Sequence, residues 1–379
     1  MLNLEALAPT LVALPQRCYT ILCMGVAVGI WIYFTSLYRL AQCVVSPIGY
    51  VNRELEIRLE SFASFIWTGL LVWWTQRVVG VQLVFYDDRP LLPGSDGQDE
   101  KEKHSNAPMA PPILPDSLFT ICNHVAYMDW FTAFCVAYYH GLRNGLLCWM
   151  VNAEALRYFL LGGMMRSRGC IGLQRRFDSD RGLLQEALTD ISRRSRSKWL
   201  GIYPEGTFID GSPNDRTVLE ASQQHCAEIG IPPFSYVLAP RWKGFAAVMA
   251  HRHFKHVLDM TIAFRTVAGG GSALPLANGE RRVPEATSLL GGGPTCPDEI
   301  HIHFALHAAE EIATAPGGPK QWLFESWRRK DARLRFFRTH DRFPSVHAAR
   351  RPTEPMFWQP LLCAFLLLFP LLCLARFFS

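Results

Sequence analysis

The sequence predicts an α/β domain over residues 81–307, and three observations lead to this prediction. Short apolar runs rich in β-formers alternate there with segments of helical periodicity. Histidine, aspartate and glutamate stand close behind two of these runs, where a strand would end. The chain has 379 residues and is 49% hydrophobic, which suits one sizeable domain with additional membrane segments.

The first predicted strand covers residues 118–122, and Asn123 and His124 follow it directly. A helical pattern then runs over residues 128–138 and contains Asp129. Residues five apart on an ideal helix point about 140° from one another, so His124 and Asp129 can meet only across an irregular turn. A histidine with a carboxylate partner can remove a proton from an alcohol. The alternative interpretation is a hydrogen-bonded histidine at a strand–helix junction without catalytic function.

Three further strands are predicted later in the chain. Residues 199–203 form one of them, and Pro204-Glu205-Gly206 ends it in a turn. A second lies within residues 168–176 between basic side chains, and a third covers residues 237–239 before Pro240. Glu205 is either a functional carboxylate or a solvated turn residue.

These segments carry a family resemblance. Asn123-His124-x4-Asp129, the basic strand at 168–176, Glu205-Gly206-Thr207 and the strand before Pro240 occur in the order found in the glycerophospholipid acyltransferase family, the relatives of lysophosphatidic acid acyltransferases. The resemblance runs from about Arg39 to the C-terminus, and residues 322–344 are similar to the long-C-terminus eukaryotic branch.

The resemblance implies a central mixed sheet surrounded by helices, and acyl transfer from a CoA thioester to the sn-2 hydroxyl of a lysophospholipid. His124 is then the general base and Asp129 its orienting partner. Acyl-CoA is the co-substrate, no cofactor or metal is expected, and the lipid hydroxyl attacks without a covalent acyl-enzyme. The substrate-binding residues implied are Asn123, Arg175, Glu205, Gly206, Thr207, Pro240, Arg241 and Lys243.

The chain departs from the family pattern at two positions. Gly172 replaces a frequent aromatic residue, and Phe208 stands where members that form phosphatidic acid usually carry arginine. The second departure weakens lysophosphatidic acid as the acceptor, because branches that use lysophosphatidylinositol or lysocardiolipin often lack this arginine too. A lipid or thioester hydrolase and an inactive membrane scaffold are the alternatives. The absence of a Gly-x-Ser-x-Gly elbow argues against the hydrolase, and the intact His124, Asp129 and Glu205 argue against the scaffold.

Two apolar runs, residues 18–38 and 356–375, are predicted membrane spans. Between them we expect an interfacial amphipathic helix over residues 49–79, with a re-entrant helix as the rival, and then the catalytic domain over residues 80–345. Residues 1–48 and 346–379 form the flanking segments. Residues 87–115 and 269–297 are rich in Gly and Pro and are predicted surface insertions.

Other residue patterns carry less chemistry. The eleven cysteines include no Cys-x-x-Cys pair, which predicts reduced thiols, with Cys122, Cys135 and Cys148 in the core. The histidines at 251–256 and 301–307 lack partners at zinc-like spacing. Residues 327–335 form a basic run that we interpret as a mostly solvated helix face. No basic–aromatic pattern indicates nucleic acid as a partner.

The arginines predict the topology. Arg39, Arg53 and Arg58 follow the first run and only Arg17 precedes it, so the positive-inside rule puts the catalytic domain in the cytosol, where acyl-CoA is found. The resemblance implies the endoplasmic reticulum membrane, with a mitochondrial membrane as the alternative. Protease added to sealed microsomes should therefore cut within residues 87–115. Protection of this segment until detergent is added would reverse the topology.

Overall fold

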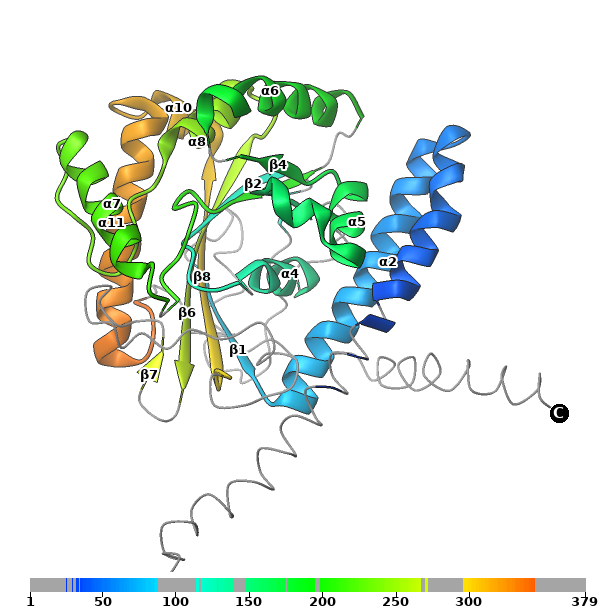
Figure 1. The fold of residues 1–379 in the computed structure, drawn as a ribbon, viewed down its shortest axis with the longest axis horizontal. Helices are drawn as coiled ribbons and strands as arrows, with labels where there is room; N and C mark the ends of the chain where they lie inside the picture. Colours follow the sequence, from blue (N-terminus) through cyan, green and yellow to red (C-terminus); the bar gives the residue numbers. More distant parts are fainter. Residues whose placement is uncertain are drawn as a thin grey trace, which may run out of the picture.

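The computed structural model describes residues 35–87, 114–115, 117–127, 129–139, 147–174, 176–194, 198–210, 212–266, 270–271 and 296–344, together with 25, 29, 32 and 33. Over these residues the chain forms an eight-stranded sheet with helices on both faces, which confirms the predicted α/β class (Figure 1). The strands are β1 (Gln82–Asp87), β2 (Leu118–Cys122), β3 (Leu147–Asn152), β4 (Ile171–Leu173), β5 (Trp199–Ile202), β6 (His256–Thr266), β7 (Gly270–Gly271) and β8 (Glu299–Ala308).

The sheet is mixed, as the resemblance implied. Its order is β1-β8-β6-β2-β5-β3-β4, with β7 paired to the end of β6. β6 runs antiparallel to β8 and β7, and the other pairs are parallel. β2 is central and parallel to both β5 and β6, so these three strands end at the same edge. That edge is where ligands bind in sheets of this kind.

Two helical layers cover the sheet. The helices and helical turns are η1 (Ser46–Tyr50), α2 (Arg53–Trp73), the π-helical η2 (Trp74–Val79), α4 (Asp129–Tyr139), η4 (Ala153–Arg157), α5 (Phe159–Ser167), α6 (Phe177–Arg194), α7 (Asp215–Glu228), α8 (Trp242–Ala250), α10 (Ala309–Thr314) and α11 (Gly318–His340). Buried side chains of α2 and α4 pack on one face of the sheet, and those of α6, α8, α10 and α11 pack on the other (Figure 1). Alternate residues of each strand enter the two cores, as the strand period requires.

Residues 237–239 do not form the predicted strand. They are buried but irregular, because side chains take up backbone N–H groups that a neighbouring strand would otherwise bind. Leu238 N–H donates to Glu205 Oε2 at 3.1 Å, and Ala239 N–H donates to Ser222 Oγ at 2.8 Å. The apolar β-formers at these positions predicted burial, which is confirmed, and a strand, which is wrong.

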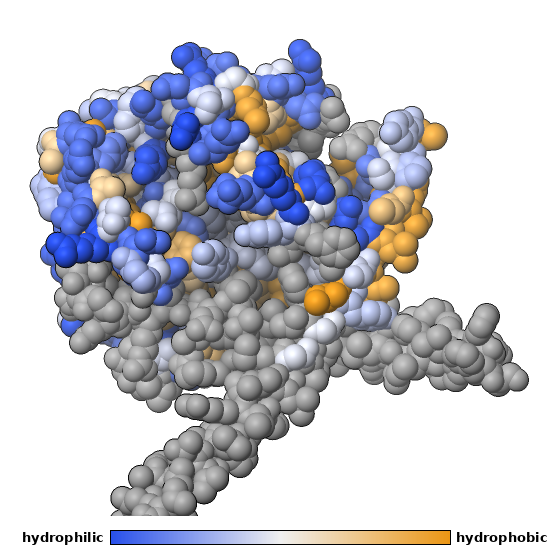
Figure 2. Space-filling view, in the orientation of Figure 1, coloured by the Kyte–Doolittle hydropathy of each residue, from blue (hydrophilic) through white to orange (hydrophobic). Residues whose placement is uncertain are grey.

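The predicted helix around residues 53–79 is present as α2 with η2. Asn52 caps it by accepting a hydrogen bond from Leu55 N–H. Its C-terminal half is buried, including Trp67 and Leu70, and it packs beside α4. Toward its N-terminus and on the preceding helical residues 35–45, apolar side chains gather on the outer surface (Figure 2): Leu40, Val44, Val51, Leu55 and Phe62.

No helix within the described residues combines the length and apolar character needed to cross a bilayer. The predicted span at 356–375 lies outside the described residues, and so does most of the one at 18–38. Most of the predicted insertions at 87–115 and 269–297 also lies outside them.

The basic run at 327–335 is only partly the solvated face that the sequence predicted. Lys330 is fully buried in α11, where its Nζ bonds the Asp259 carboxylate and the Met260 carbonyl of β6. Ser326 Oγ also donates to Asp259 Oδ2, at 2.6 Å. The basic residues of this run lie on different sides of α11, some exposed and Lys330 buried. The charge of a residue alone does not predict which side of the helix faces the sheet.

This ion pair makes stability depend on pH. Burial alone would raise the pKa of Asp259, but the charges of Lys330 and Arg333 and the hydrogen bonds bring the pKa down to about 2. Because the folded pKa lies below the unfolded value of about 3.9, the stabilisation is complete above pH ~4 and is lost as the pH falls towards ~2.

Replacing one partner should therefore destabilise the fold. We expect Lys330→Met to lower the free energy of unfolding by about 3–5 kcal/mol at pH 7, because it leaves a buried carboxylate unpaired. Denaturant unfolding of this variant, with the exposed Lys320→Met on the same helix as control, measures the effect. Equal stability of the two variants would contradict the role assigned to the pair.

Candidate active site

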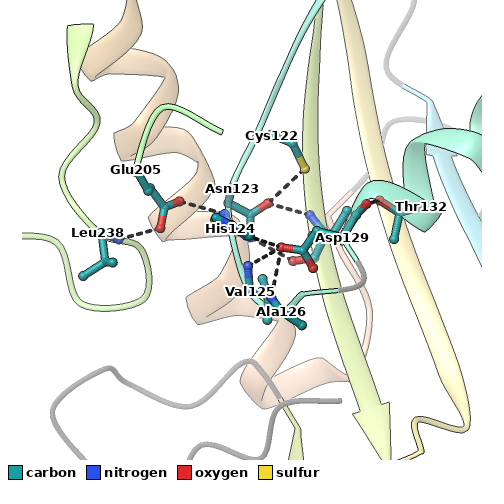
Figure 3. Close-up of polar contacts among 10 residues, drawn as sticks. Cys122, Asn123, His124, Val125, Ala126, Asp129, Thr132, Glu205 and Leu238 are labelled. Carbon is teal, nitrogen blue, oxygen red and sulfur yellow. Dashed lines mark hydrogen bonds and ion pairs between the residues drawn. The ribbon is translucent and has the colours of Figure 1, made fainter. Parts of the chain in front are cut away.

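His124 and Asp129 meet at the carboxyl end of β2. Five irregular residues, 123–127, follow the strand, and α4 begins at Asp129 itself. The His124 Nδ1 atom lies 2.9 Å from Asp129 Oδ2 (Figure 3). The predicted irregular turn is therefore confirmed. A carboxylate accepts hydrogen bonds, so Nδ1 carries the proton and Nε2 is the ring nitrogen left to act on a substrate.

Asp129 also shapes the turn that carries His124. Its Oδ2 accepts hydrogen bonds from the backbone N–H groups of Val125 and Ala126, the latter at 3.0 Å. The residue is fully buried, whereas 17% of the His124 side chain is exposed. One carboxylate oxygen thus organises both the backbone and the imidazole.

Asn123 fixes the other end of the same turn. Its side-chain amide exchanges two hydrogen bonds with the backbone of Ile262 on β6: Ile262 N–H donates to Oδ1 at 2.8 Å, and Nδ2 donates to the carbonyl at 3.1 Å. This pair continues the β2–β6 ladder for one more position after the last paired residues, Cys122 and Met260. The structure therefore places Asn123 in a buried positioning role behind His124.

The Glu205 carboxylate is likewise directed into the protein. Oε1 accepts from His124 N–H and Oε2 from Leu238 N–H, both at 3.1 Å (Figure 3). Glu205 is buried and joins the ends of β2 and β5 to the irregular segment before Pro240. The resemblance implies that Glu205 binds the acceptor. In the structure both of its carboxylate oxygens accept hydrogen bonds from backbone N–H groups, one of them that of His124. An effect of Glu205 on acceptor binding is therefore indirect, through the position of His124.

The remaining predicted residues surround the turn after β5. Gly206 has a φ of +72°, which favours glycine, and a Cβ there would lie 3.7 Å from the Arg241 side chain. Arg241 N–H donates to the Pro204 carbonyl at 2.8 Å. The structure therefore brings five of the predicted residues to one edge of the sheet: Glu205, Gly206, Thr207, Pro240 and Arg241. Lys243 is exposed as the second residue of α8, and Arg175 lies outside the described residues.

Two aromatic residues that the sequence did not indicate as site residues contact the His124 ring directly. The rings of Tyr203 and Phe208 lie 4.4 Å and 4.6 Å from the His124 ring, centroid to centroid. The sequence indicated Phe208 only as a departure from the family pattern. Both residues lie close to Glu205 in the sequence, Tyr203 before it and Phe208 after it. Because Glu205 binds the His124 backbone, the same segment brings Tyr203 and Phe208 to the imidazole.

The other titratable groups nearby do not compete with His124 as a base or nucleophile. Burial raises the pKa of Cys122 well above its usual value, so this thiol stays protonated. Burial raises the pKa of Tyr203 in the same way. Across the described part of the chain, His, Cys, Asp and Glu side chains form no group of three that could hold a metal ion.

A His–Asp pair that follows the central strand of an α/β sheet can remove a proton from the hydroxyl group of a substrate. The hydroxyl oxygen can then attack directly, so no nucleophilic side chain is needed. The model of the Acyltransferase family matches residues 104–265, which include the pair, Glu205 and Arg241.

Curated proteins give the same result. The chain is 28% identical over 225 residues to lysocardiolipin acyltransferase 1 of Danio rerio, covering 58% of this chain and 52% of that protein. It is 25% identical over 226 residues to 1-acyl-sn-glycerol-3-phosphate acyltransferase 2 of Brassica napus, covering 59% and 52%. The chain spans about half the length of these relatives. These comparisons support the glycerophospholipid acyltransferase family that the sequence pattern resembles.

The Asp129 contacts generate a prediction. Asp129→Asn keeps an acceptor for the Val125 and Ala126 amides but removes the charge that holds the Nδ1–H tautomer. We expect turnover to fall by about 10²–10⁴ with little change in melting temperature. The exposed Asp178→Asn serves as the matched control. Turnover of Asp129→Asn within twofold of the control would contradict the assignment.

Proposed function

We propose that this protein transfers a fatty acyl group from acyl-CoA to the sn-2 hydroxyl of a lysophospholipid, in phospholipid synthesis or remodelling. The observation that carries this proposal is the His124–Asp129 hydrogen bond at the end of β2. Many reactions begin with deprotonation of a hydroxyl group. The match to the Acyltransferase family favours acyl transfer among them.

In the proposed reaction His124 Nε2 takes the proton of the acceptor hydroxyl as its oxygen attacks the thioester carbonyl. The new C–O bond forms, the tetrahedral intermediate collapses, and the C–S bond breaks. The imidazolium returns its proton to the leaving CoA thiolate, so His124 is regenerated. Asp129 stays ionised throughout and stabilises the imidazolium.

The acceptor class follows from two lines of support. Relatives named as acting on 1-acyl-sn-glycerol 3-phosphate and on lysocardiolipin both match this chain. Phe208 supplies no donor to an acceptor phosphate, whereas an arginine there would supply a fork of them. This favours a lysophospholipid with a phosphodiester headgroup, such as lysophosphatidylinositol or lysocardiolipin, over lysophosphatidic acid.

A bilayer is the proposed source of the acceptor. The outer face of helical residues 35–45 and of α2 exposes Leu40, Val44 and Phe62, each more than half accessible. Apolar side chains gathered on one face of a helix pair suit insertion into the headgroup region. The endoplasmic reticulum membrane, or a mitochondrial membrane, would supply such a surface.

The function is tested by incubating the purified full chain with labelled oleoyl-CoA and a panel of lysophospholipids. We expect a labelled diacyl product, and His124→Ala should lower its rate by about 10²–10⁴ because the general base is lost. Rapid release of labelled oleate without an acceptor would show a thioester hydrolase instead. Wild-type turnover in His124→Ala would exclude the mechanism, and no product with any acceptor would favour the scaffold.

A further inference from the structure

The His124 imidazole is enclosed by two aromatic rings from one short segment. Tyr203 stacks on it with centroids 4.4 Å apart and planes 22° apart, and Phe208 lies 4.6 Å away at 50°. Each ring contacts the imidazole without contacting the other, so the two rings lie on different sides of it, Tyr203 stacked and Phe208 tilted. Contacts of this length are at the close end of the range for stacked rings.

Each of these rings is itself supported. Trp149 on β3 stacks behind Tyr203 at 4.8 Å with the planes 6° apart, and the edge of Tyr127 meets Phe208 at 4.8 Å and 86°. We call Trp149, Tyr203, His124, Phe208 and Tyr127 the aromatic column. It begins at a buried tryptophan and ends at Tyr127, which is 67% exposed. The Tyr203 side of the imidazole is therefore anchored in the core, and the Phe208 side is open to the surface.

The Tyr203 hydroxyl does not explain the presence of this residue. It is buried and has no hydrogen-bond partner within the described residues, and burial raises the pKa of Tyr203 well above its usual value. A buried hydroxyl without a partner destabilises a fold. The contribution that Tyr203 makes to the site is consequently its ring.

The Asp129 bond alone does not fix the imidazole. A single hydrogen bond at Nδ1 leaves the ring able to turn about the Nδ1–Oδ2 line and to tip out of plane. The two ring contacts oppose these motions, and the aromatic rings attract the positive charge that the imidazole acquires in the proposed proton transfer. The same segment holds the His124 backbone through Glu205, so one turn controls both parts of the residue.

We propose that Tyr203 and Phe208 are positioning residues that hold the His124 ring from its two faces and keep Nε2 aimed at the reacting hydroxyl. This inference rests on the proposed function for its kinetic consequence, and on geometry alone for the ring contacts. Misplacing a catalytic group by about 1 Å can lower the rate on the order of a hundredfold. Loss of either ring should therefore lower kcat and leave KM largely unchanged.

The kinetic test compares aliphatic with aromatic replacements. Phe208→Leu and Tyr203→Leu should lower kcat about ten- to a hundredfold, with KM for oleoyl-CoA and for the acceptor within about twofold of wild type. Phe208→Tyr and Tyr203→Phe keep the rings and should recover most of the lost turnover. If the aromatic variants are as slow as the leucine variants, or if the leucine variants change KM instead of kcat, positioning is excluded.

A matched control comes from α11. The half-buried Phe336 stacks on the exposed His340 at 3.8 Å, with planes 8° apart. Phe336→Leu removes a phenyl face from a histidine that takes no part in the proposed chemistry. Its kcat should stay within twofold of wild type, so a similar loss in Phe336→Leu and Phe208→Leu would mean that both act through general stability.

A second measurement does not depend on activity. With ring-¹³C-labelled histidine, the His124 signals are identified by their absence in His124→Gln. The stacked Tyr203 ring and the adjacent Phe208 ring should shift the His124 ring protons upfield of their free values, and Phe208→Leu should remove part of this shift. Unshifted His124 signals in the wild type would exclude the enclosed imidazole. A wild-type protein with shifted signals but no acyl transfer would refute the proposed function and leave the ring contacts standing.

Discussion

The site depends on buried carboxylates that bind backbone amides where no strand or helix does so. Asp129 binds Val125 and Ala126, Glu205 binds His124 and Leu238, and Asp331 accepts from Ser235 N–H and Tyr236 N–H at 2.9 Å and 2.6 Å. Catalytic turns must leave regular structure to present side chains, yet buried N–H groups need partners. A charged acceptor meets two such groups at once, so these three carboxylates make an irregular backbone rigid.

α11 is part of this support although it lies beyond the segment that the family model covers. Asp331 holds the irregular segment whose Leu238 binds Glu205, and Lys330 next to it holds β6, where Ile262 binds Asn123. Two adjacent residues therefore support both sides of the His124 turn through different elements. α11 therefore belongs to the same structural unit as the candidate site, because Lys330 and Asp331 are buried against β6 and against the irregular segment before Pro240.

Polar and aromatic contacts have separate tasks around His124. The carboxylates fix the backbone and the Nδ1 edge of the ring, and they leave its two faces uncovered by any hydrogen bond. Tyr203 and Phe208 contact the ring from different sides. These contacts cover apolar surface of the imidazole and make no hydrogen bond to it. The alternation of Tyr203, Glu205 and Phe208 along one turn supplies both kinds of contact.

The α/β class, the strands at 118–122 and 199–203 and the helix at 128–138 could be predicted from local apolar runs and periodicity, and the structure confirms them with bounds that shift by at most one residue. The motif spacing predicted that His124 and Asp129 meet only across an irregular turn, which the fold supplies. Local pattern did not predict that residues 237–239 are irregular, that Lys330 is buried, or that Tyr203 and Phe208 contact the His124 ring. The reason is that partners 30 to 100 residues distant, such as Glu205 for Leu238 and Asp331 for Tyr236, set these outcomes. The local pattern of apolar and polar residues predicts whether a residue is buried. It does not predict which distant side chain accepts the hydrogen bond of its backbone N–H group.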